Sequence, residues 1–203
     1  MIVYLATRNA GKVREMQALF AGSGIELRLD DGYEAPVEGA TSYADNAALK
    51  ARALHARLMA AGSAANVLAD DSGLEVRALA GRPGVLTAEY GGVEMPWSER
   101  RRALLAELAV SASADRRARF VCALHFIGVD GRELATMATV DGVVPPEERG
   151  ELGFSFDPVF VYEPAGLTFA EMSEDTKNAV SHRAVAVAGL LAMVRVAEVG
   201  ART

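Results

Sequence analysis

The chain has 203 residues, 51% of them hydrophobic, which is enough to bury the core of one domain over 1–203. Its net charge of −6 lacks the basic excess typical of duplex-binding proteins, so we expect no nucleic acid partner. The longest apolar stretch, Ala184 to Val194, is shorter than the roughly 20 residues that span a bilayer, so we expect no membrane association. The single cysteine, Cys122, allows no internal disulfide and favours a cytoplasmic location.

Strands and helices alternate along the chain. The sequence predicts, in order, a strand at 1–6, a helix at 12–21, a strand at 24–29, a loop at 31–41, a helix at about 42–61, a strand at 66–69, a helix at about 96–109, a hairpin around Asp130-Gly131, a loop at 145–157, a strand at 158–162 and helical sequence at about 175–198. This order indicates an α/β fold with a mixed, twisted sheet and flanking helices.

The segment "ATRNAGKVRE" at 6–15 places Thr7, Asn9 and Lys12 between a predicted strand and a predicted helix. Free amides and the positive end of a helix dipole are suited to an anion, with Lys12 as a point charge. A βα turn that uses Asn and Gly for their conformations explains the same residues equally well.

The segment "LADDSGLEV" at 68–76 sets Asp70 beside Asp71 at the end of an apolar run. Two such charges about 4 Å apart repel by roughly 4 kcal/mol near a protein surface, so something should compensate them. Taken alone, Asp-Asp-Ser-Gly favours a turn. If the backbone instead stays extended, the two carboxylates point to opposite faces.

The segment "GFSFDPVF" at 153–160 carries Phe154 and Phe156, and cations follow at 177–183. Aromatic rings and cations are suited to a nucleobase and its phosphates, although both rings could equally belong to the core. Lys177 and Arg183 cannot share one helix face. If both contact one ligand, the helix must break near Ser181, whose hydroxyl would cap a new helix.

Four motifs in one order resemble the inosine triphosphate pyrophosphatase family: T-x-N-x-x-K, A-D-D-S-G-L, G-F-x-[YF]-D-P-[VI]-F and K-x-x-x-S-H-R. The resemblance extends from Ile2 to about Leu191. It implies an elongated, two-lobed fold around a central cleft and, usually, a homodimer. It also implies hydrolysis of deaminated purine nucleoside triphosphates (ITP, dITP and XTP) to the monophosphate and pyrophosphate.

The resemblance also implies roles for individual residues. Glu38 and Asp71 would bind Mg²⁺, with Asp70 as an alternate ligand, and Asp71 and Lys50 would be catalytic. The implied substrate contacts are Thr7, Arg8, Asn9, Ala10, Gly11, Lys12, Ser72, Phe154, Ser155, Phe156, Asp157, Lys177, His182 and Arg183.

The sequence departs from the family pattern at three positions. Ser155 and Phe156 stand where the family usually has glycine and tyrosine, and Glu89 stands where it usually has arginine. Ser155 and Phe156 affect base preference more than reaction type, whereas Glu89 reverses a charge and so bears on any role of that arginine at the cleft rim or at a subunit interface. Two alternatives are a Maf-like nucleotide pyrophosphatase with another base preference and a nucleotide-binding module without catalysis.

Overall fold

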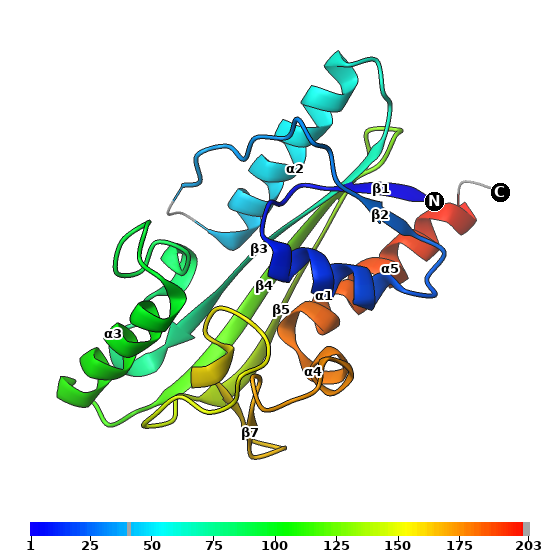
Figure 1. Ribbon diagram of the computed structural model, residues 1–203. Helices are drawn as coiled ribbons and strands as arrows, with labels where there is room; N and C mark the ends of the chain where they lie inside the picture. Colours follow the sequence, from blue (N-terminus) through cyan, green and yellow to red (C-terminus); the bar gives the residue numbers. More distant parts are fainter. Residues whose placement is uncertain (40–41, 201–203) are drawn as a thin grey trace. The chain divides into compact units, whose positions relative to one another are not determined.

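The computed structural model describes residues 1–39 and 42–200, so residues 40–41 of the expected loop and 201–203 of the expected domain lie outside the described part. Its α-helices and β-strands, labelled in Figure 1 except for β6, are β1 (Ile2–Leu5), α1 (Ala10–Phe20), β2 (Glu26–Arg28), α2 (Tyr43–Ala60), β3 (Asn66–Val76), α3 (Trp97–Val110), β4 (Arg117–Ile127), β5 (Glu133–Val143), β6 (Val161–Tyr162), β7 (Leu167–Thr168), α4 (Glu174–Val180) and α5 (His182–Gly200). Short 3-10 turns lie at Arg77–Leu79, Gly84–Leu86 and Asp157–Val159.

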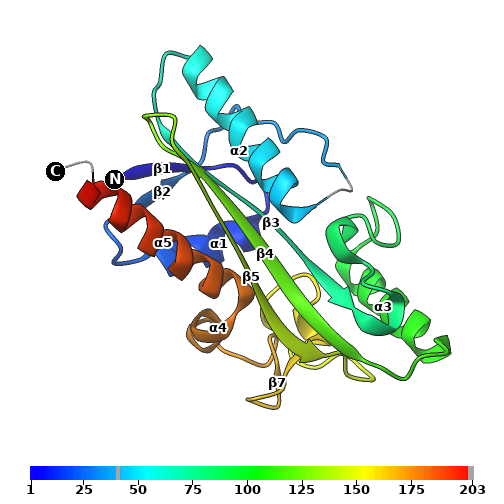
Figure 2. The ribbon, with the colours of Figure 1, turned by 180° about the vertical axis from the view of Figure 1, so that it is seen from behind.

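The strands form one sheet in the order β2-β1-β3-β4-β5-β6-β7. β1 pairs in parallel with both β2 and β3, whereas β6 pairs antiparallel with β5 and β7. The sheet is therefore mixed and carries helices, as the sequence predicted. The long strands β3, β4 and β5 are seen from behind in Figure 2.

The chain divides into two compact units. Unit 1 comprises Met1–Asp71, Cys122–Ala138 and the chain from His182 onward, and unit 2 comprises Ser72–Val121 and Thr139–Ser181.

Unit 1 has a core on each face of its strands, because neighbouring strand residues alternate between faces. Leu68 packs with residues of α1 and α5, whereas Val67 packs with residues of α2. Both ribbon views show α1 alongside α5 (Figures 1 and 2), and the two helices are in contact. Three layers result, with α2 on one side and α1 with α5 on the other.

Unit 2 has one aromatic-rich core. It joins β3, β4 and β5 to α3 and to the segment after β5, through Leu74, Leu104, Phe120, Phe156, Phe160 and Phe169 among others. Other residues of the same strands are polar, and Glu75 of β3 forms an ion pair with Arg119 of β4 at 2.7 Å. Alternating apolar and polar residues are typical of strands buried on one face.

The turn expected at Asp-Asp-Ser-Gly is wrong, because β3 continues from Asn66 to Val76. β3 lies between β1 and β4 in the sheet. The pairing of β3 with β1 covers Asn66 to Leu68, so β4 is the sheet neighbour whose ladder hydrogen bonds can satisfy the backbone groups beyond that point. Gly73 is not among the glycines with positive φ, so the backbone conformation there is compatible with a strand.

The strand expected at 158–162 is also shorter than predicted, because only Val161–Tyr162 forms β6. Asp157–Val159 is a 3-10 turn, closed by the amide of Val159 donating to the carbonyl of Phe156. Pro158 has no amide hydrogen to give to a sheet, and its fixed φ is compatible with the first turn of a helix.

The break expected near Ser181 is confirmed. Ser181 has an extended backbone, with φ −71° and ψ 156°, between α4 and α5, and the two helices are bent by 60°. No single helix in the described part of the chain is long and apolar enough to cross a membrane, and α4 with α5 meets that test only as this bent pair.

The turn at Gly150 predicts a measurable packing constraint. Gly150 has φ +81°, and a Cβ there would lie 2.3 Å from the carbonyl carbon and oxygen of Ala170. Gly150→Ala should therefore lower the free energy of unfolding by about 2–5 kcal/mol, from backbone strain plus overpacking. Denaturant unfolding measures this loss.

The matched control is Gly166→Ala, because Gly166 has φ +67° and a Cβ added there would have no other atom within 4 Å. It should lose only the strain, about 1–2 kcal/mol. Equal losses at the two positions would contradict the packing argument.

Candidate active site

The loop between β1 and α1 is held by its own side chains. Asn9 caps α1, with its Oδ1 accepting from the amides of Gly11 at 2.9 Å and Lys12 at 3.2 Å. The backbone amide of Asn9 donates to Thr7 Oγ1 at 3.2 Å. Ala10 is the first residue of the helix. The predicted strand–loop–helix geometry is confirmed, and the loop lies at the positive end of the α1 dipole.

Arg8, an expected substrate contact, is engaged with the backbone. Its Nε donates to the carbonyl of Tyr33 at 2.9 Å, and its Nη2 donates to the same carbonyl at 2.6 Å and to that of Asp31 at 2.5 Å. These bonds tie the β1–α1 loop to the segment that leads to Glu38. In this structure Arg8 joins two loops of unit 1.

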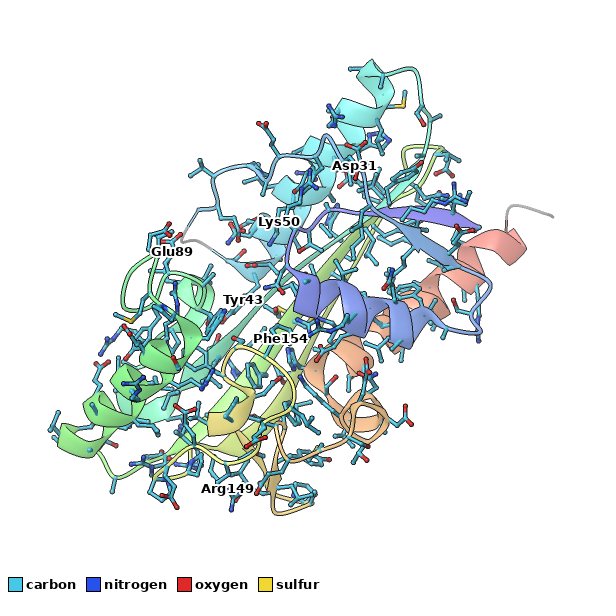
Figure 3. All side chains as sticks on the ribbon, viewed as in Figure 1. Asp31, Tyr43, Lys50, Glu89, Arg149 and Phe154 are labelled. Atoms are coloured by element: carbon cyan, nitrogen blue, oxygen red, sulfur yellow. The ribbon has the colours of Figure 1, made fainter. Side chains whose placement is uncertain are left out.

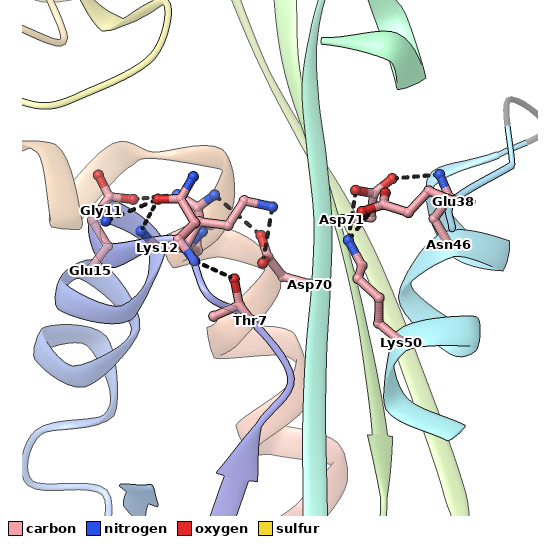
Figure 4. Close-up of polar contacts among 11 residues, drawn as sticks. Thr7, Gly11, Lys12, Glu15, Glu38, Asn46, Lys50, Asp70 and Asp71 are labelled. Atoms are coloured by element: carbon pink, nitrogen blue, oxygen red, sulfur yellow. Dashed lines mark hydrogen bonds and ion pairs between the residues drawn. The ribbon is translucent and has the colours of Figure 1, made fainter. Parts of the chain in front are cut away.

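Asp70 and Asp71 lie on opposite sides of β3, as Figure 4 shows. Asp70 is 1% exposed; its Oδ1 forms an ion pair with Lys12 Nζ at 3.1 Å, and its Oδ2 accepts a hydrogen bond from Arg183 Nη2 at 3.3 Å. Arg183 Nη1 also contacts Glu15 Oε2. The α1 side of β3 therefore has a buried network in which two carboxylates meet two cations.

This network shifts the pKa of Asp70. Burial alone would raise that pKa, but the charges of Lys12 and Arg183 outweigh burial and lower it well below its usual range. Asp70 is therefore ionised at neutral pH. Burial likewise opposes the charge of Arg183, yet Asp70 and Glu15 raise its pKa and keep it protonated.

Asp71 faces a different set of groups on the α2 side of β3. Its Oδ1 accepts Lys50 Nζ at 3.0 Å and its Oδ2 accepts Asn46 Nδ2 at 3.2 Å. Lys50 Nζ also lies 3.4 Å from Glu38 Oε2, and Asn46 Oδ1 accepts the amide of Gly39 at 3.1 Å. One ammonium thus bridges two of the carboxylates that the sequence predicted as metal ligands (Figure 4). Lys50 is also labelled among all the side chains in Figure 3.

The pKa of Asp71 is shifted in the opposite direction from that of Asp70. Burial raises it more than Lys50 lowers it, and the nearby Glu38 adds to the rise. Burial would lower the pKa of Lys50, but Asp71, Asp70 and Glu38 raise it. Lys50 therefore stays protonated, and Asp71, whose pKa is raised, is the more readily protonated of the two aspartates.

The donor set fits a hard cation. Mg²⁺ is commonly held by one or two carboxylates together with water and substrate phosphates, and Glu38 with Asp71 supplies two converging carboxylates. Within 1–39 and 42–200, no three His, Cys, Asp or Glu side chains group as a metal site. Asp70 does not join the pair, since its carboxylate lies across β3 from Asp71.

The second group of predicted residues lies in unit 2. Asp157 Oδ2 accepts the amide of Phe154 at 2.7 Å and Lys177 Nζ at 2.5 Å. Lys177 Nζ also lies 5.1 Å from the centre of the Phe154 ring, within the range of a cation–π contact. The structure therefore brings Phe154, Asp157 and Lys177 together, as the motifs predicted.

The two phenylalanines of this loop occupy different environments. Phe154 is partly exposed, whereas Phe156 is 0% exposed and packs edge-to-face against Trp97 and Tyr90, with ring centres 5.4 and 6.2 Å away. The core interpretation therefore holds for Phe156. Ser155 between them has φ +59°, a conformation that glycine adopts at less cost.

The remaining predicted residues are divided between the units. His182 and Arg183 begin α5 in unit 1 and are buried, whereas Lys177 belongs to unit 2. Ser72 is a half-buried residue of β3 in unit 2, and Glu89 is exposed.

Glu15 and Asn46 contact the site residues but were not predicted from the sequence. The helical spacing could have identified both residues. Glu15 follows Lys12 by three residues in α1, and Asn46 precedes Lys50 by four residues in α2, so each pair lies on one helix face.

Comparison with known proteins identifies the family. The family model of the Ham1 family matches residues 3–193. The chain belongs to the Ham1 family. The chain is 45% identical over 192 residues to a dITP/XTP pyrophosphatase of Geobacillus kaustophilus. The aligned region covers 93% of this chain and 91% of that protein. The chain is 42% identical to a dITP/XTP pyrophosphatase of Deinococcus radiodurans, over 94% of this chain and 91% of that protein.

Solved structures agree with this assignment. The Ham1 protein of Staphylococcus aureus superposes with a TM-score of 0.81 at 31% identity, covering 96% of this chain and 98% of that one. A HAM1 protein from Coxiella burnetii gives a TM-score of 0.83 at 30% identity, with the same coverage. The predicted mixed α/β fold of this family is confirmed.

The Asp70 network predicts a pH dependence of stability. The folded-state pKa of Asp70 is lower than its unfolded value, so its contribution is present above about pH 4 and is lost as pH falls toward the folded pKa. Asp70→Asn removes the carboxylate that pairs with Lys12 and leaves the buried Arg183 with Glu15 alone, so it should lower the free energy of unfolding by about 3–5 kcal/mol at neutral pH.

Denaturant unfolding between pH 7 and pH 2 measures both effects. The loss caused by Asp70→Asn should shrink as pH falls. Asp141→Asn, at an exposed position of β5, is the control and should follow the wild-type curve. A constant difference between Asp70→Asn and wild type across this range would contradict the assigned ionisation of Asp70.

Proposed function

We propose that this Ham1 protein hydrolyses deaminated purine nucleoside triphosphates, namely ITP, dITP and XTP, to the nucleoside monophosphate and pyrophosphate. The observation that carries the proposal is the Lys50 ammonium, held by Asp71 at 3.0 Å and Glu38 at 3.4 Å in a chain 45% identical to a dITP/XTP pyrophosphatase. Two carboxylates and a lysine are the groups that a metal-assisted attack on a phosphate requires.

The reaction forms one bond and breaks one. A water oxygen attacks the α-phosphorus while the bond from that phosphorus to the bridging oxygen of the β-phosphate breaks, and pyrophosphate leaves with that oxygen. We propose that the Asp71 carboxylate orients the water and accepts its proton. The raised pKa of Asp71 supports this role, because a base whose pKa lies closer to the working pH transfers protons more effectively.

Cationic side chains would stabilise the negative charge of the phosphates. Lys50 is already held as a protonated ammonium in unit 1, and Lys12 lies at the N-terminus of α1 beside Thr7 and Asn9. Lys177 is the corresponding cation of unit 2. Positive groups fixed before the reaction need no reorganisation as charge develops.

The proposed cofactor is Mg²⁺, held by Glu38 and Asp71. When bound, it would neutralise phosphate charge and polarise the bond to the leaving group. Asp70 is a weaker candidate ligand, because its carboxylate lies across β3 from those of Asp71 and Glu38.

The base would be recognised in part by the 153–157 loop. Phe154 is partly exposed and can stack on a purine. Donors near His182 and Arg183 would donate hydrogen bonds to the 6-keto oxygen, whereas adenine presents a donor there and would leave those buried donors unpaired. We also propose that the enzyme works as a cytoplasmic homodimer on free nucleotides.

Pyrophosphate release tests the proposal against its alternatives. We expect turnover of dITP, XTP and ITP in the presence of Mg²⁺ and far slower turnover of dTTP and ATP. Preference for dTTP would favour a Maf-like activity. Binding of nucleotides without any metal-dependent turnover would favour a module that does not catalyse.

Replacing Asp71 tests the proposed base. Asp71→Asn removes the proton acceptor but keeps an oxygen near Lys50 and should lower kcat for dITP by at least about 100-fold. Steady-state kinetics measures the loss, and circular dichroism checks that the fold is retained. Glu163→Gln, at an exposed position of unit 2, is the control. A folded Asp71→Asn enzyme of near-normal activity would remove Asp71 from the mechanism.

Replacing Lys50 tests the shared carboxylate pair. The ammonium competes with a divalent cation for Glu38 and Asp71, so Lys50→Met should strengthen Mg²⁺ binding in the absence of nucleotide by about tenfold while lowering turnover. Calorimetric titration with Mg²⁺ measures the affinity. Arg52→Met, at an exposed position of the same helix, should leave it unchanged. Weaker Mg²⁺ binding by Lys50→Met would contradict a site made of this pair.

A further inference from the structure

The 153–157 loop has a backbone conformation that its sequence does not favour. Ser155 has φ +59°, in the left-handed region, where a residue with a Cβ is disfavoured relative to glycine. Interactions from outside the loop must therefore hold it. Because the partly exposed Phe154 directly precedes Ser155, the conformation at Ser155 bears on how Phe154 is presented.

Helix α3 supplies such interactions. Arg101 Nη1 donates to the carbonyl of Ser155 at 3.0 Å, and Arg101 Nε donates to Glu148 Oε2 at 2.7 Å. Trp97, one helical turn earlier, packs edge-to-face on Phe156 at 5.4 Å. Residues four apart share one helix face, so one face of α3 contacts both Ser155 and the residue that follows it.

The guanidinium of Arg101 is fixed by its second contact. Its side chain is 16% exposed and that of Glu148 is 31% exposed, so their ion pair is only partly screened by water. The fork of a guanidinium can hold a carboxylate and a carbonyl at the same time, and this restricts the direction in which it donates to Ser155.

The 153–157 loop is also held by a hydrogen bond between two of its own residues and by a contact from α4. Asp157 Oδ2 accepts both the Phe154 amide and Lys177 Nζ, which lies over the Phe154 ring. These contacts fix the two ends of the turn but do not touch the Ser155 carbonyl. The contact from Arg101 is the one that acts on the strained residue itself.

We propose that Arg101 is a positioning residue that determines nucleotide affinity and base selectivity by holding Ser155 in its left-handed conformation, so that Phe154 is presented to a purine base. This inference rests on the proposed function, because it takes Phe154 to be the stacking residue. Without Arg101, the loop would populate its binding-competent conformation only part of the time, and apparent affinity falls by that fraction.

The test uses the full-length enzyme and the kinetics of dITP hydrolysis. Arg101→Ala should raise KM by roughly tenfold, as expected for the loss of a hydrogen bond from a charged donor, and should change kcat by less than about twofold. The ratio of kcat/KM for dITP over dATP should fall as well. Arg102→Ala removes the exposed neighbour on the same helix and should leave both constants unchanged.

A second substitution separates positioning from charge. Glycine adopts positive φ at little cost, so adding Ser155→Gly to Arg101→Ala should return KM to within about threefold of wild type. Arg101→Lys keeps the charge but not the fork and should retain most of the defect. If Arg101→Ala fails to fold, Glu148→Gln, which frees the guanidinium, should show a smaller rise in KM in the same direction.

The outcomes distinguish this inference from the function on which it rests. A wild-type enzyme that does not hydrolyse dITP overturns the proposed function, and the inference with it. An active wild-type enzyme with an unchanged KM in Arg101→Ala overturns the inference alone. A KM defect that Arg101→Lys repairs and Ser155→Gly does not would also overturn it, because that pattern indicates a role for charge.

Discussion

The candidate site depends on the uninterrupted alternation of side chains along β3. An extended backbone sends Asp70 and Asp71 to opposite faces of the sheet. Two adjacent carboxylates that would repel in a turn are thereby separated, and each meets its own cations. One faces Lys12 and Arg183, and the other faces Lys50. Their pKa values then shift in opposite directions, so two identical residues acquire different chemistry.

The buried network beside Asp70 is better suited to fixing geometry than to adding stability. Removing charges from water costs free energy that an ion pair recovers only in part. Once buried, however, Arg183 and Lys12 are held in place by a carboxylate at the centre of the sheet. Cations that are fixed in advance are effective at stabilising anionic ligands, because they lose little freedom when the ligand arrives.

Unit 2 applies the same principle around Asp157. The Asp157 carboxylate accepts hydrogen bonds from the Phe154 backbone amide and from the Lys177 ammonium. The packing of Phe156 against Trp97 also holds the 153–157 loop. Two phenylalanines separated by one residue thus have different roles. Phe156 fills the core, whereas Phe154 is partly exposed.

Local sequence was sufficient for the elements and for several of their boundaries. Apolar periodicity located the helices, Ser42 caps α2, Asp130-Gly131 lies between β4 and β5, and Ser181 separates α4 from α5, because these signals act within a few residues. Resemblance to a family supplied the residues of the site. Neither the local sequence signals nor the family resemblance could establish which side chains those residues contact.

Tertiary structure decided what each of those residues contacts. Asp70 and Asp71 stay in a strand because β3 pairs with β1 as far as Leu68 and has β4 as its other neighbour in the sheet, which overrides the local preference of Asp-Asp-Ser-Gly for a turn. Arg183 meets Glu15 across 168 residues of sequence. Such contacts depend on the folding of the whole chain, so local propensities determined the elements of this protein, and only the packing of distant segments determined the charges that surround its two aspartates.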